Sequence, residues 1–306
     1  MKIFRGFEEA RGIRNPVVTT GSFDGVHIGH KTILNRLKML AAKYDGESVL
    51  ITFDPHPRKV LYPETAGKDL KLINSQEEKL ELLRKSGLDN LIIIEFTKEF
   101  SKITSEEFVR DILHGILNAR VVVVGFNHHF GFNKEGDYKH LWNWREKYNF
   151  EAEEIPEQEV QHEVVSSTRI RKAISEGYIQ RANAYLDHYY MIMGTPEKYE
   201  IPGPESLPSF FNVPVTEECK ILPATGIYAV YVITGNTGSK GMALICSEEG
   251  KGTLVLVHVF EEQERFPGQK STMLFHKMIR GTVHLSDPNL GIRLQHSKDE
   301  ISELIY

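Results

Sequence analysis

Short apolar runs alternate with amphipathic segments through the first 155 residues, and this alternation constrains the fold more than any other feature of the sequence. Val121–Val124 is apolar at every position, as expected of a parallel strand that is covered on both faces. Further strands are expected at residues 16–20, 49–53, 91–94 and 150–155. A β-α-β-α order of this kind predicts a doubly wound α/β sheet, whose ligands bind beyond the carboxyl ends of the strands.

Side chains that can cap helices mark where the helices begin. Ser75 with Glu78, and Thr104 with Glu107, have the spacing of a capping box. Apolar residues also recur at helical spacing between the expected strands. The helices expected from these signals lie over residues 30–44, after Ser75, over residues 104–117 and around Trp142.

The composition changes from about Gly194, where a proline-rich stretch over residues 196–214 indicates an irregular entry into a second unit. Short strands between glycine-containing turns follow, which predicts a small antiparallel β-barrel or sandwich. A short helix over residues 180–186 closes the first unit, so we expect domains at 1–187 and 188–306. The strands expected in the second domain are residues 226–233, 242–245, 253–260 and 278–285.

Composition narrows the class of protein. A chain of 306 residues suits two domains of about 100–200 residues each. The net charge of −5 argues against a protein whose main task is binding nucleic acid, but it does not limit binding of a small phosphorylated ligand. The two cysteines, Cys219 and Cys246, lack CxxC spacing, which favours reduced, buried thiols over a disulfide or zinc site.

No targeting segment is expected. The basic residues near the N-terminus are not followed by the apolar stretch of a secretory signal. No apolar run approaches the roughly 18 residues that span a bilayer. We therefore expect a cytoplasmic protein with no membrane partner.

The segment after the first expected strand reads Gly21-Ser22-Phe23-Asp24-Gly25-Val26-His27-Ile28-Gly29-His30. His27 and His30 are three residues apart, so they share a face in the first turn of a helix. A helix N-terminus favours anions, two imidazoles can donate hydrogen bonds to phosphate oxygens, and Gly29 leaves room for a nucleotide. Such a site stabilises charge on a phosphoryl group in transfer and needs no covalent nucleophile.

This segment resembles the nucleotide-binding signature of the FAD synthetase module in the prokaryotic riboflavin kinase/FAD synthetase family, within the wider nucleotidyltransferase superfamily marked by HxGH. Phe53-Asp54-Pro55-His56-Pro57 resembles the family's TFDPHP. Residues 124–131, followed by Gly136-Asp137, resemble its VGxNFxFG…GD, and residues 166–171 resemble its SSTxIR. The resemblance covers residues 1–187 and implies a Rossmann-like doubly wound parallel sheet of the HxGH nucleotidyltransferase type, followed by a small antiparallel β-barrel.

The resemblance also implies roles for individual residues. It makes the enzyme an FMN adenylyltransferase, in which an FMN phosphate oxygen attacks the α-phosphorus of ATP in line and Mg²⁺ bridges the phosphates. The catalytic residues are then His27, His30, Asn127 and Arg171. The ATP-binding residues are Gly21, Phe23, Asp24, Gly29, Ser167 and Thr168, and the FMN-binding residues are Phe53, His56, Pro57, Phe126 and His128. No residue is assigned as a metal ligand.

Chemistry supports several of these assignments. Asn127 can donate and accept hydrogen bonds without adding negative charge beside phosphates. Ser167 or Thr168 can cap a helix over residues 169–176, and with Arg171 they form an anion site that the family uses for the β- and γ-phosphates. His56 stands between two prolines, which fix the turn that presents its ring.

Plainer interpretations stay open for each segment. The turn at His56, an exposed turn at Asp24 and a simple helix cap before Arg171 need no ligand. His128 and His129 depart from the family pattern. They could bind a metal, although adjacent residues on an extended segment point in opposite directions.

The second domain resembles riboflavin kinase in its placement and in residues 222–230, which are similar to the family's LPxxGVYAV. The kinase segment GRxLGFPTAN is not recognisable, and its metal-binding Thr falls on Phe210. The catalytic Glu of the family's ExHxxDF-like strand falls on Val257, within Leu256-Val257-His258-Val259-Phe260. Neither side chain can bind Mg²⁺ or take a proton, so we expect riboflavin kinase activity to be absent.

Three alternatives compete with this interpretation. The chain could be a bifunctional riboflavin kinase/FAD synthetase, a nucleotidyltransferase with another phosphate acceptor such as a phosphocholine-like or pantetheine-like group, or a non-catalytic flavin-nucleotide sensor. The FDPHP segment and Asn127 argue against another acceptor, and the intact His27, His30 and Arg171 argue against a sensor. The barrel could brace the enzyme, bind flavin or form a homo-oligomer contact; the expected partners are ATP and FMN.

Overall fold

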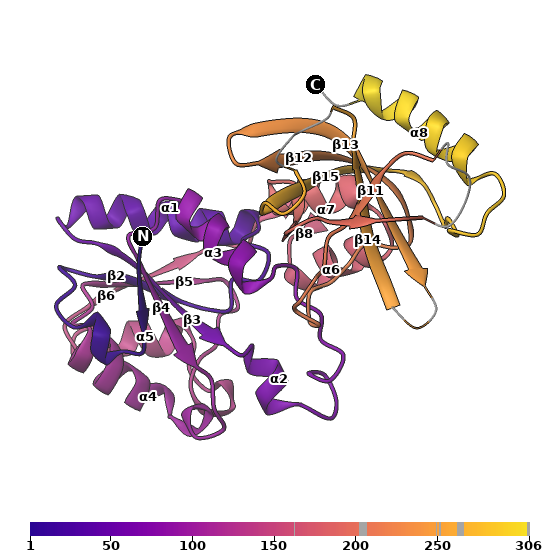
Figure 1. Ribbon diagram of the computed structural model, residues 1–306. Helices are drawn as coiled ribbons and strands as arrows, with labels where there is room; N and C mark the ends of the chain where they lie inside the picture. The colour runs from indigo at the N-terminus through magenta and orange to yellow at the C-terminus, as the bar shows by residue number, and fades with distance from the viewer. Residues whose placement is uncertain (162, 202–206, 249, 251, 262–265, 305–306) are drawn as a thin grey trace. The chain divides into compact units, whose positions relative to one another are not determined.

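The computed structural model describes residues 1–306 except 162, 202–206, 249, 251, 262–265 and 305–306 (Figure 1). The chain forms two compact units. The N-terminal unit consists of Met1–Leu70 and Lys79–Val165, and the C-terminal unit consists of Lys71–Glu78 and Ser166–Tyr306. These units are defined by packing, whereas the functional domains 1–187 and 188–306 stay a prediction.

The N-terminal unit contains the predicted parallel sheet. Its six strands lie in the order β1-β4-β3-β2-β5-β6, and every pair is parallel. The sequence did not reveal β1, which pairs with β4 at the edge of the sheet and has no buried residue. The strands are β1 (Lys2–Arg5), β2 (Val17–Thr20), β3 (Ser48–Asp54), β4 (Asn90–Glu95), β5 (Val121–Gly125) and β6 (Glu151–Ile155).

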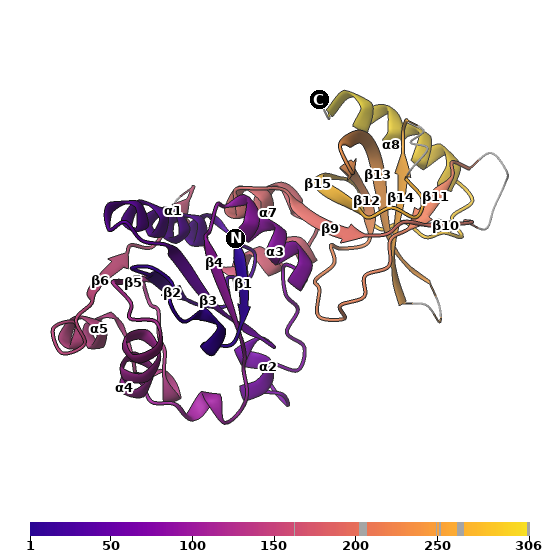
Figure 2. The same cartoon turned by 60° about the vertical axis from the view of Figure 1, so that its left-hand side comes forward.

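Helices cover both faces of this sheet. Figures 1 and 2 show α1 (Ile28–Lys43) on one face and α4 (Ser105–Glu107) and α5 (Tyr138–Trp144) on the other. Because both faces are covered, every residue of Val121–Val124 is at most 2% exposed, as its composition predicts. The other regular elements are α2 (Pro57–Leu61), α3 (Gln76–Lys85), the β7–β8 hairpin (Glu159–Val160, Glu163–Val164), the 3-10 turns η1 (Glu8–Ala10), η2 (Phe100–Lys102) and η4 (Phe132–Lys134), and the π-helix η3 (Phe108–Ile116).

Both predicted capping boxes are present. The Ser75 and Thr104 hydroxyls accept hydrogen bonds from the backbone N–H of Glu78 and Glu107, at 3.2 Å each. The two glutamates accept from the backbone N–H of their capping residues, at 2.9 Å each. The helix after Thr104 is α-helical for only three residues and then π-helical through Ile116, which periodicity alone does not predict.

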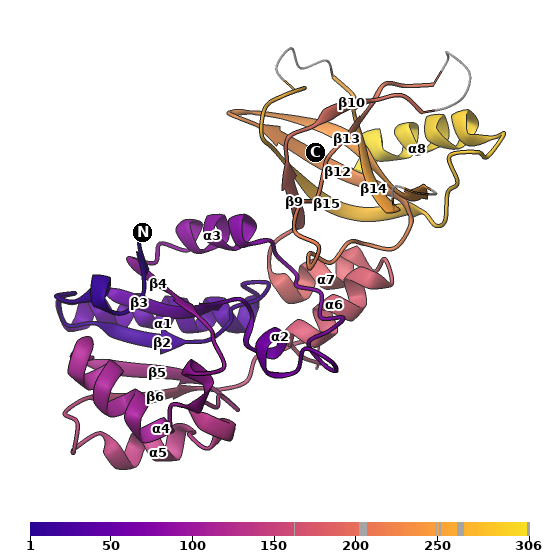
Figure 3. The same ribbon diagram turned by 60° about the horizontal axis from the view of Figure 1, so that its bottom comes forward.

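The C-terminal unit contains a curled antiparallel half-barrel, as predicted (Figure 3). Its seven strands lie in the order β10-β11-β14-β13-β12-β15-β9, and α8 packs against β12, β13 and β15. The elements are α6 (Ser167–Ser175), α7 (Ile179–Leu186), β9 (Tyr190–Gly194), β10 (Glu197–Tyr199), β11 (Phe210–Asn212), β12 (Gly226–Thr234), β13 (Thr237–Glu248), β14 (Gly252–Val259), β15 (Ser271–Arg280) and α8 (Leu290–Leu304).

Two expectations for this unit need correction, and one helix was missed. The last strand covers Ser271–Arg280 rather than 278–285, because its pairing with β12 begins at Ser271. The proline-rich stretch is not irregular throughout: it contains β10 and β11, while residues 202–206 lie outside the described part. The helix α8 was not predicted from the sequence.

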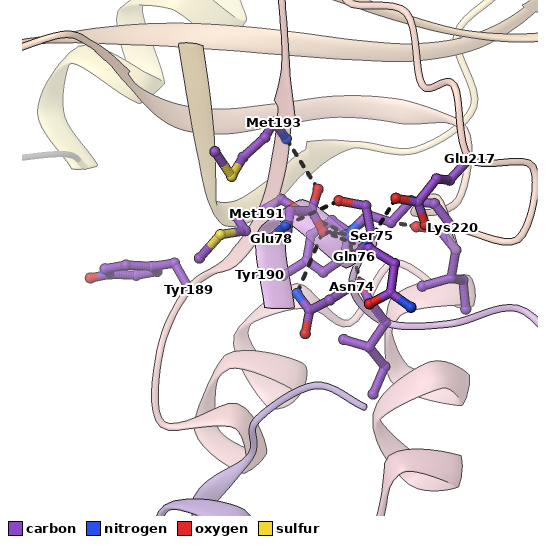
Figure 4. A network of polar contacts seen from close by, with 12 residues as sticks. Asn74, Ser75, Gln76, Glu78, Tyr189, Tyr190, Met191, Met193, Glu217 and Lys220 are labelled. Atoms are coloured by element: carbon purple, nitrogen blue, oxygen red, sulfur yellow. Dashed lines mark hydrogen bonds and ion pairs between the residues drawn. The ribbon is translucent and has the colours of Figure 1, made fainter. Parts of the chain in front are cut away.

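A segment from the first quarter of the chain belongs to the C-terminal unit. Leu72 exchanges backbone hydrogen bonds with Cys219 and Ile221, at 2.6 and 2.8 Å. Figure 4 shows the polar network around it, in which Lys220 Nζ donates to Glu78 Oε2 at 2.6 Å. The same ammonium donates to the carbonyls of Ile73 at 2.6 Å and Met191 at 2.9 Å, so all three of its hydrogens are used.

The cysteines are free, as expected. Cys246 is buried in the half-barrel, and this burial raises the pKa of its thiol to about 11. Cys219 is half-buried. Among the described residues, no helix is both long enough and apolar enough to cross a membrane.

Candidate active site

The candidate site lies beside β2, where the strand order of the parallel sheet reverses. From β2 the chain proceeds outward to β3 and β4 on one side, whereas β5 and β6 extend the sheet on the other. In doubly wound sheets this switch point, at the carboxyl ends of the strands, is where ligands bind. The carboxyl ends of β2, β3 and β5 and the segments after them contain the candidate residues of the N-terminal unit.

The turn after β2 is held by neighbouring backbone and by burial. Gly21 N–H donates to the Ile51 carbonyl at 3.0 Å, and Val26 N–H donates to the Phe23 carbonyl at 3.2 Å. Phe23 and Val26 have φ values of 49° and 42°, a left-handed conformation that costs energy for bulky and β-branched residues. Both are at most 3% exposed, so packing stabilises a backbone that would otherwise relax.

Three aromatic rings stack within this turn. The ring centroids of His27 and His30 are 3.7 Å apart with planes inclined by 18°, and those of Phe23 and His30 are 4.4 Å apart with planes inclined by 22°. His27 is the N-cap of α1, which therefore begins within two residues of its expected start. The two histidines lie together at the amino end of a 16-residue helix.

Burial controls the charge of His30. It lowers the pKa of the imidazole well below the ordinary value, and the nearby His27 and Lys79 lower that pKa further. At neutral pH the ring is therefore uncharged, with one N–H donor and one acceptor nitrogen. Among the described residues, His30 Nδ1 has no hydrogen-bond partner.

Two glycines make the ring stack sterically feasible. A Cβ at Gly29 would lie 3.2 Å from His27 Cε1, and a Cβ at Gly21 would lie 3.2 Å from the Phe23 ring. A Cβ at Gly125, the last residue of β5, would lie 3.1 Å from Ile33 Cδ1 of α1. Glycine at these positions therefore allows the rings to stack and brings the end of β5 against α1.

Asp24 is buried, with 4% of its surface exposed, so the alternative of an exposed turn residue is wrong.

The end of β3 and the turn after it contain one residue that packs and one that caps a helix. Phe53, the last residue but one of β3, packs against Phe96 and Phe100, with ring centroids 5.4 and 5.8 Å away. His56 caps α2, because its Nδ1 accepts a hydrogen bond from Arg58 N–H at 3.2 Å.

The first residue of α2 is Pro57, a position at which the missing N–H costs nothing. The turn at His56 therefore has a structural role of its own. This capping role uses Nδ1 alone, and the His56 side chain as a whole is half-buried. The structure brings the TFDPHP-like segment to the same end of the sheet as His27 and His30, because β3 lies beside β2 and both run in the same direction.

The segment after β5 presents polar and aromatic side chains to solvent. Phe126 is 51% exposed, and Asn127 is exposed with a φ of 59°. His128 N–H donates to the Gly125 carbonyl at 3.1 Å, which closes the turn. Exposure of Asn127 directly after a central strand is compatible with contact to a ligand, whereas a packing role would bury it.

The two neighbouring histidines differ in environment. His128 is half-buried and lies beside Phe130, with ring centroids 6.1 Å apart, whereas His129 is exposed. Burial, aided by the charge of His129, lowers the pKa of His128 to about 4. In the part of the chain that the structure describes, no group of three or more His, Cys, Asp or Glu side chains could hold a metal ion.

The second predicted anion site begins the C-terminal unit. The helix cap is Ser166, whose hydroxyl accepts from Arg169 N–H at 3.4 Å. The expected cap at Ser167 or Thr168 is therefore wrong by one or two residues, because α6 already begins at Ser167. Thr168 is exposed, and the side chains of Ser167 and Arg171 are half-buried.

The sheet, its switch point and the HxGH turn together define a nucleotidyltransferase of the doubly wound α/β type. The family model described as FAD synthetase matches residues 10–169, which is more than half of the chain, and the model described as riboflavin kinase matches residues 187–299. The chain belongs to the FAD synthetase family, and it contains an FMN adenylyltransferase domain followed by a riboflavin kinase-like module.

Relatives of known name agree with this membership. A bifunctional riboflavin kinase/FMN adenylyltransferase from Listeria monocytogenes is 29% identical over 94% of this chain and 90% of its own length. An FAD synthetase from the same organism is 35% identical over 70% of this chain and 80% of its own. A bifunctional enzyme from Escherichia coli is 26% identical over 99% and 96% of the two chains.

Among solved structures, one described as a macrolide-efflux protein from Streptococcus pneumoniae has a TM-score of 0.87 and covers 100% of both chains. It is 23% identical to this chain, so the likeness concerns the fold alone. The sequence therefore predicted the family and the fold correctly, and the site segments stay a prediction. It missed the burial of Asp24, the stacked rings and the contribution of residues 71–78 to the C-terminal unit.

Proposed function

We propose that this chain transfers AMP from ATP to FMN, giving FAD and pyrophosphate. The observation that carries the proposal is the stacked pair His27–His30 at the amino end of α1, at the switch point of the sheet. Unpaired N–H groups at a helix end and imidazole donors favour a phosphate there. The FAD synthetase family, which uses ATP and FMN, supplies the identity of the substrates.

The reaction is a displacement at the α-phosphorus of ATP. An oxygen of the FMN phosphate forms the new P–O bond, the bond to the bridging α–β oxygen breaks, and pyrophosphate leaves with the electron pair. His27 and His30 donate hydrogen bonds to the phosphate oxygens, and Asn127 orients the acceptor phosphate. Mg²⁺ bound together with ATP would supply positive charge that offsets the charge of the phosphates, and positioning by the protein accounts for most of the rate.

The remaining candidates divide between the two substrates. Gly21, Phe23, Asp24 and Gly29 are assigned to ATP by the family resemblance, whereas the exposed Phe126 and the half-buried His128 suit contact with a flat, largely apolar flavin. Ser167, Thr168 and Arg171 are assigned to the β- and γ-phosphates by the family resemblance. Phe53, His56 and Pro57 are assigned to FMN on the same ground.

We further propose that the chain does not phosphorylate riboflavin. Phe210, on which the kinase's metal-binding Thr falls, is 1% exposed within the half-barrel core. Its strand pairs with the strand expected to carry the catalytic Glu, where Leu256 and Val257 are fully buried. Apolar side chains at both places support the loss of kinase activity, because neither can bind Mg²⁺ or accept a proton.

A bifunctional enzyme is the second candidate. The riboflavin kinase model matches residues 187–299, and the relatives that match more than 90% of this chain are described as bifunctional. These matches favour a second activity more strongly than they favour its loss. The apolar residues Phe210, Leu256 and Val257 favour loss of the kinase activity, whereas the likeness of the whole module favours a bifunctional enzyme.

Parallel assays with purified protein, ATP and Mg²⁺ test both proposals. Formation of FAD and pyrophosphate from FMN is expected, and a protein that binds FMN and ATP without turnover would be a sensor instead. Riboflavin in place of FMN should give neither FMN nor FAD. Any riboflavin-dependent FMN would make the chain bifunctional and overturn the loss of the kinase.

A further inference from the structure

Phe23 is buried beside the candidate catalytic pair, at 3% exposure. Its side chain therefore has little surface with which to meet ATP directly. Two rings at 3.7 and 4.4 Å from His30, both nearly parallel to it, cannot share one of its faces. His30 accordingly lies between His27 and Phe23.

Hydrogen bonds do not hold the His30 ring at both of its nitrogens. Its Nδ1 is buried and has no partner among the described residues. A neutral imidazole also lacks the charge that an ion pair would use to orient it. The plane of the ring, and with it the direction of the Nε2 position, depends on ring packing.

The backbone is shaped around the Phe23 ring. The residue adopts φ 49°, a conformation that a phenylalanine rarely takes. Gly21 carries no Cβ where one would lie 3.2 Å from the same ring. Both features are expected where a side chain must occupy one position.

We propose that Phe23 is a positioning residue for adenylyl transfer: its ring, stacked on His30 opposite His27, holds the imidazole in the orientation that meets the phosphate. This inference rests on the proposed function for its catalytic part. The stack itself is a property of the protein without substrate. The ring stack and its role in catalysis can therefore be tested separately.

The test compares Phe23→Leu, which keeps an apolar side chain of similar bulk but removes the flat ring, with wild type. Steady-state kinetics with FMN and ATP should give a kcat lowered about tenfold, with the KM for FMN within twofold. In NMR spectra of protein with labelled histidine, the His30 ring signal, assigned with His30→Gln, should lose the ring-current shift that Phe23 causes.

Leu37→Ala is the matched control, because Leu37 is fully buried on the same helix and is not part of the ring stack. It should lower stability without moving the His30 signal. If Phe23→Leu does not fold, Phe23→Met replaces it, with the same expected results. A kcat like that of the control, or an unmoved His30 signal, would overturn the proposal.

Wild-type protein that makes no FAD would instead refute the proposed function. The NMR comparison would then still decide whether Phe23 orients His30.

Discussion

Lys220 Nζ lies 2.6 Å from Glu78 Oε2, and neither side chain is more than 2% exposed. The two residues are 142 positions apart, yet both belong to the C-terminal unit. Glu78 also completes the capping box of α3, and its other carboxylate oxygen accepts from Met193 N–H at 3.1 Å. A buried carboxylate with several donors can keep its charge, so this pair anchors residues 71–78 in the unit.

Lys220→Met should destabilise the protein by about 3–5 kcal/mol, because it leaves the Glu78 carboxylate buried without its cation. Urea denaturation followed by circular dichroism measures the change. Lys270→Met is the matched control: Lys270 pairs with Glu77, the residue next to Glu78, but both side chains are about half exposed. It should cost less than about 1 kcal/mol. Equal losses in the two variants would show that burial does not strengthen the role of Lys220.

The pairing of Glu78 with Lys220 could not be predicted from the sequence. The capping box of Ser75 and Glu78 was visible as local spacing, but the partner Lys220 is not, because a lone lysine gives no signal of burial. Strand β1 was missed for a related reason: its four residues form a half-polar edge without alternation. Local patterns therefore gave the inner strands and helix starts, whereas contacts over long separations did not appear in them.

The candidate site likewise has features that short-range sequence patterns predict and features that they do not. His27, His30 and Asn127 could be proposed from the sequence because the motif and the strand before each of them are short-range features. The stack of Phe23 on His30 and the burial of Asp24 depend on a turn with unusual φ values, which sequence spacing does not encode. Motif recognition assigned Phe23 to nucleotide binding, which stays a prediction, and the structure adds that its ring stacks on His30.

His30→Ala should lower kcat for FAD formation about 100-fold, since it removes a donor aimed at charge that develops during transfer. ATP and FMN binding, measured by isothermal titration calorimetry, should weaken far less. His114→Ala removes an exposed imidazole from the π-helix η3 and should leave kcat within twofold. A His30→Ala enzyme with wild-type turnover would remove this residue from the catalytic set.

Gly29→Ala should separate activity from stability. Alanine favours a helix over glycine by about 1 kcal/mol, which offsets the strain of the added Cβ, so the stability of the variant should lie within about 1 kcal/mol of wild type. Its Cβ would press on the His27 ring at 3.2 Å, and kcat should fall about tenfold. Gly281→Ala, where a Cβ meets nothing within 4 Å, should leave kcat unchanged. Thermal melts and FAD assays on both variants give the comparison, and an unimpaired Gly29→Ala enzyme would contradict it.

The protein should lose stability as the pH falls from about 6.5 towards 4. His128 has a pKa of about 4 in the folded protein and an ordinary value near 6.5 in the unfolded chain. Between these values the unfolded chain binds a proton that the folded protein excludes, so folding weakens as the pH drops, by about 3 kcal/mol at pH 4 for this residue. His30, whose pKa is also lowered by burial, acts in the same direction.

Replacing the titrating ring should flatten this dependence. Urea denaturation at pH 7 and pH 4.5 should show a smaller stability difference for His128→Asn than for wild type. His129→Asn is the control, because its side chain is exposed and its charge is the lesser cause of the lowered pKa of His128. If both variants keep the full wild-type dependence, the acid sensitivity arises elsewhere, and the His128 ring is not excluded from protons by its burial beside Phe130.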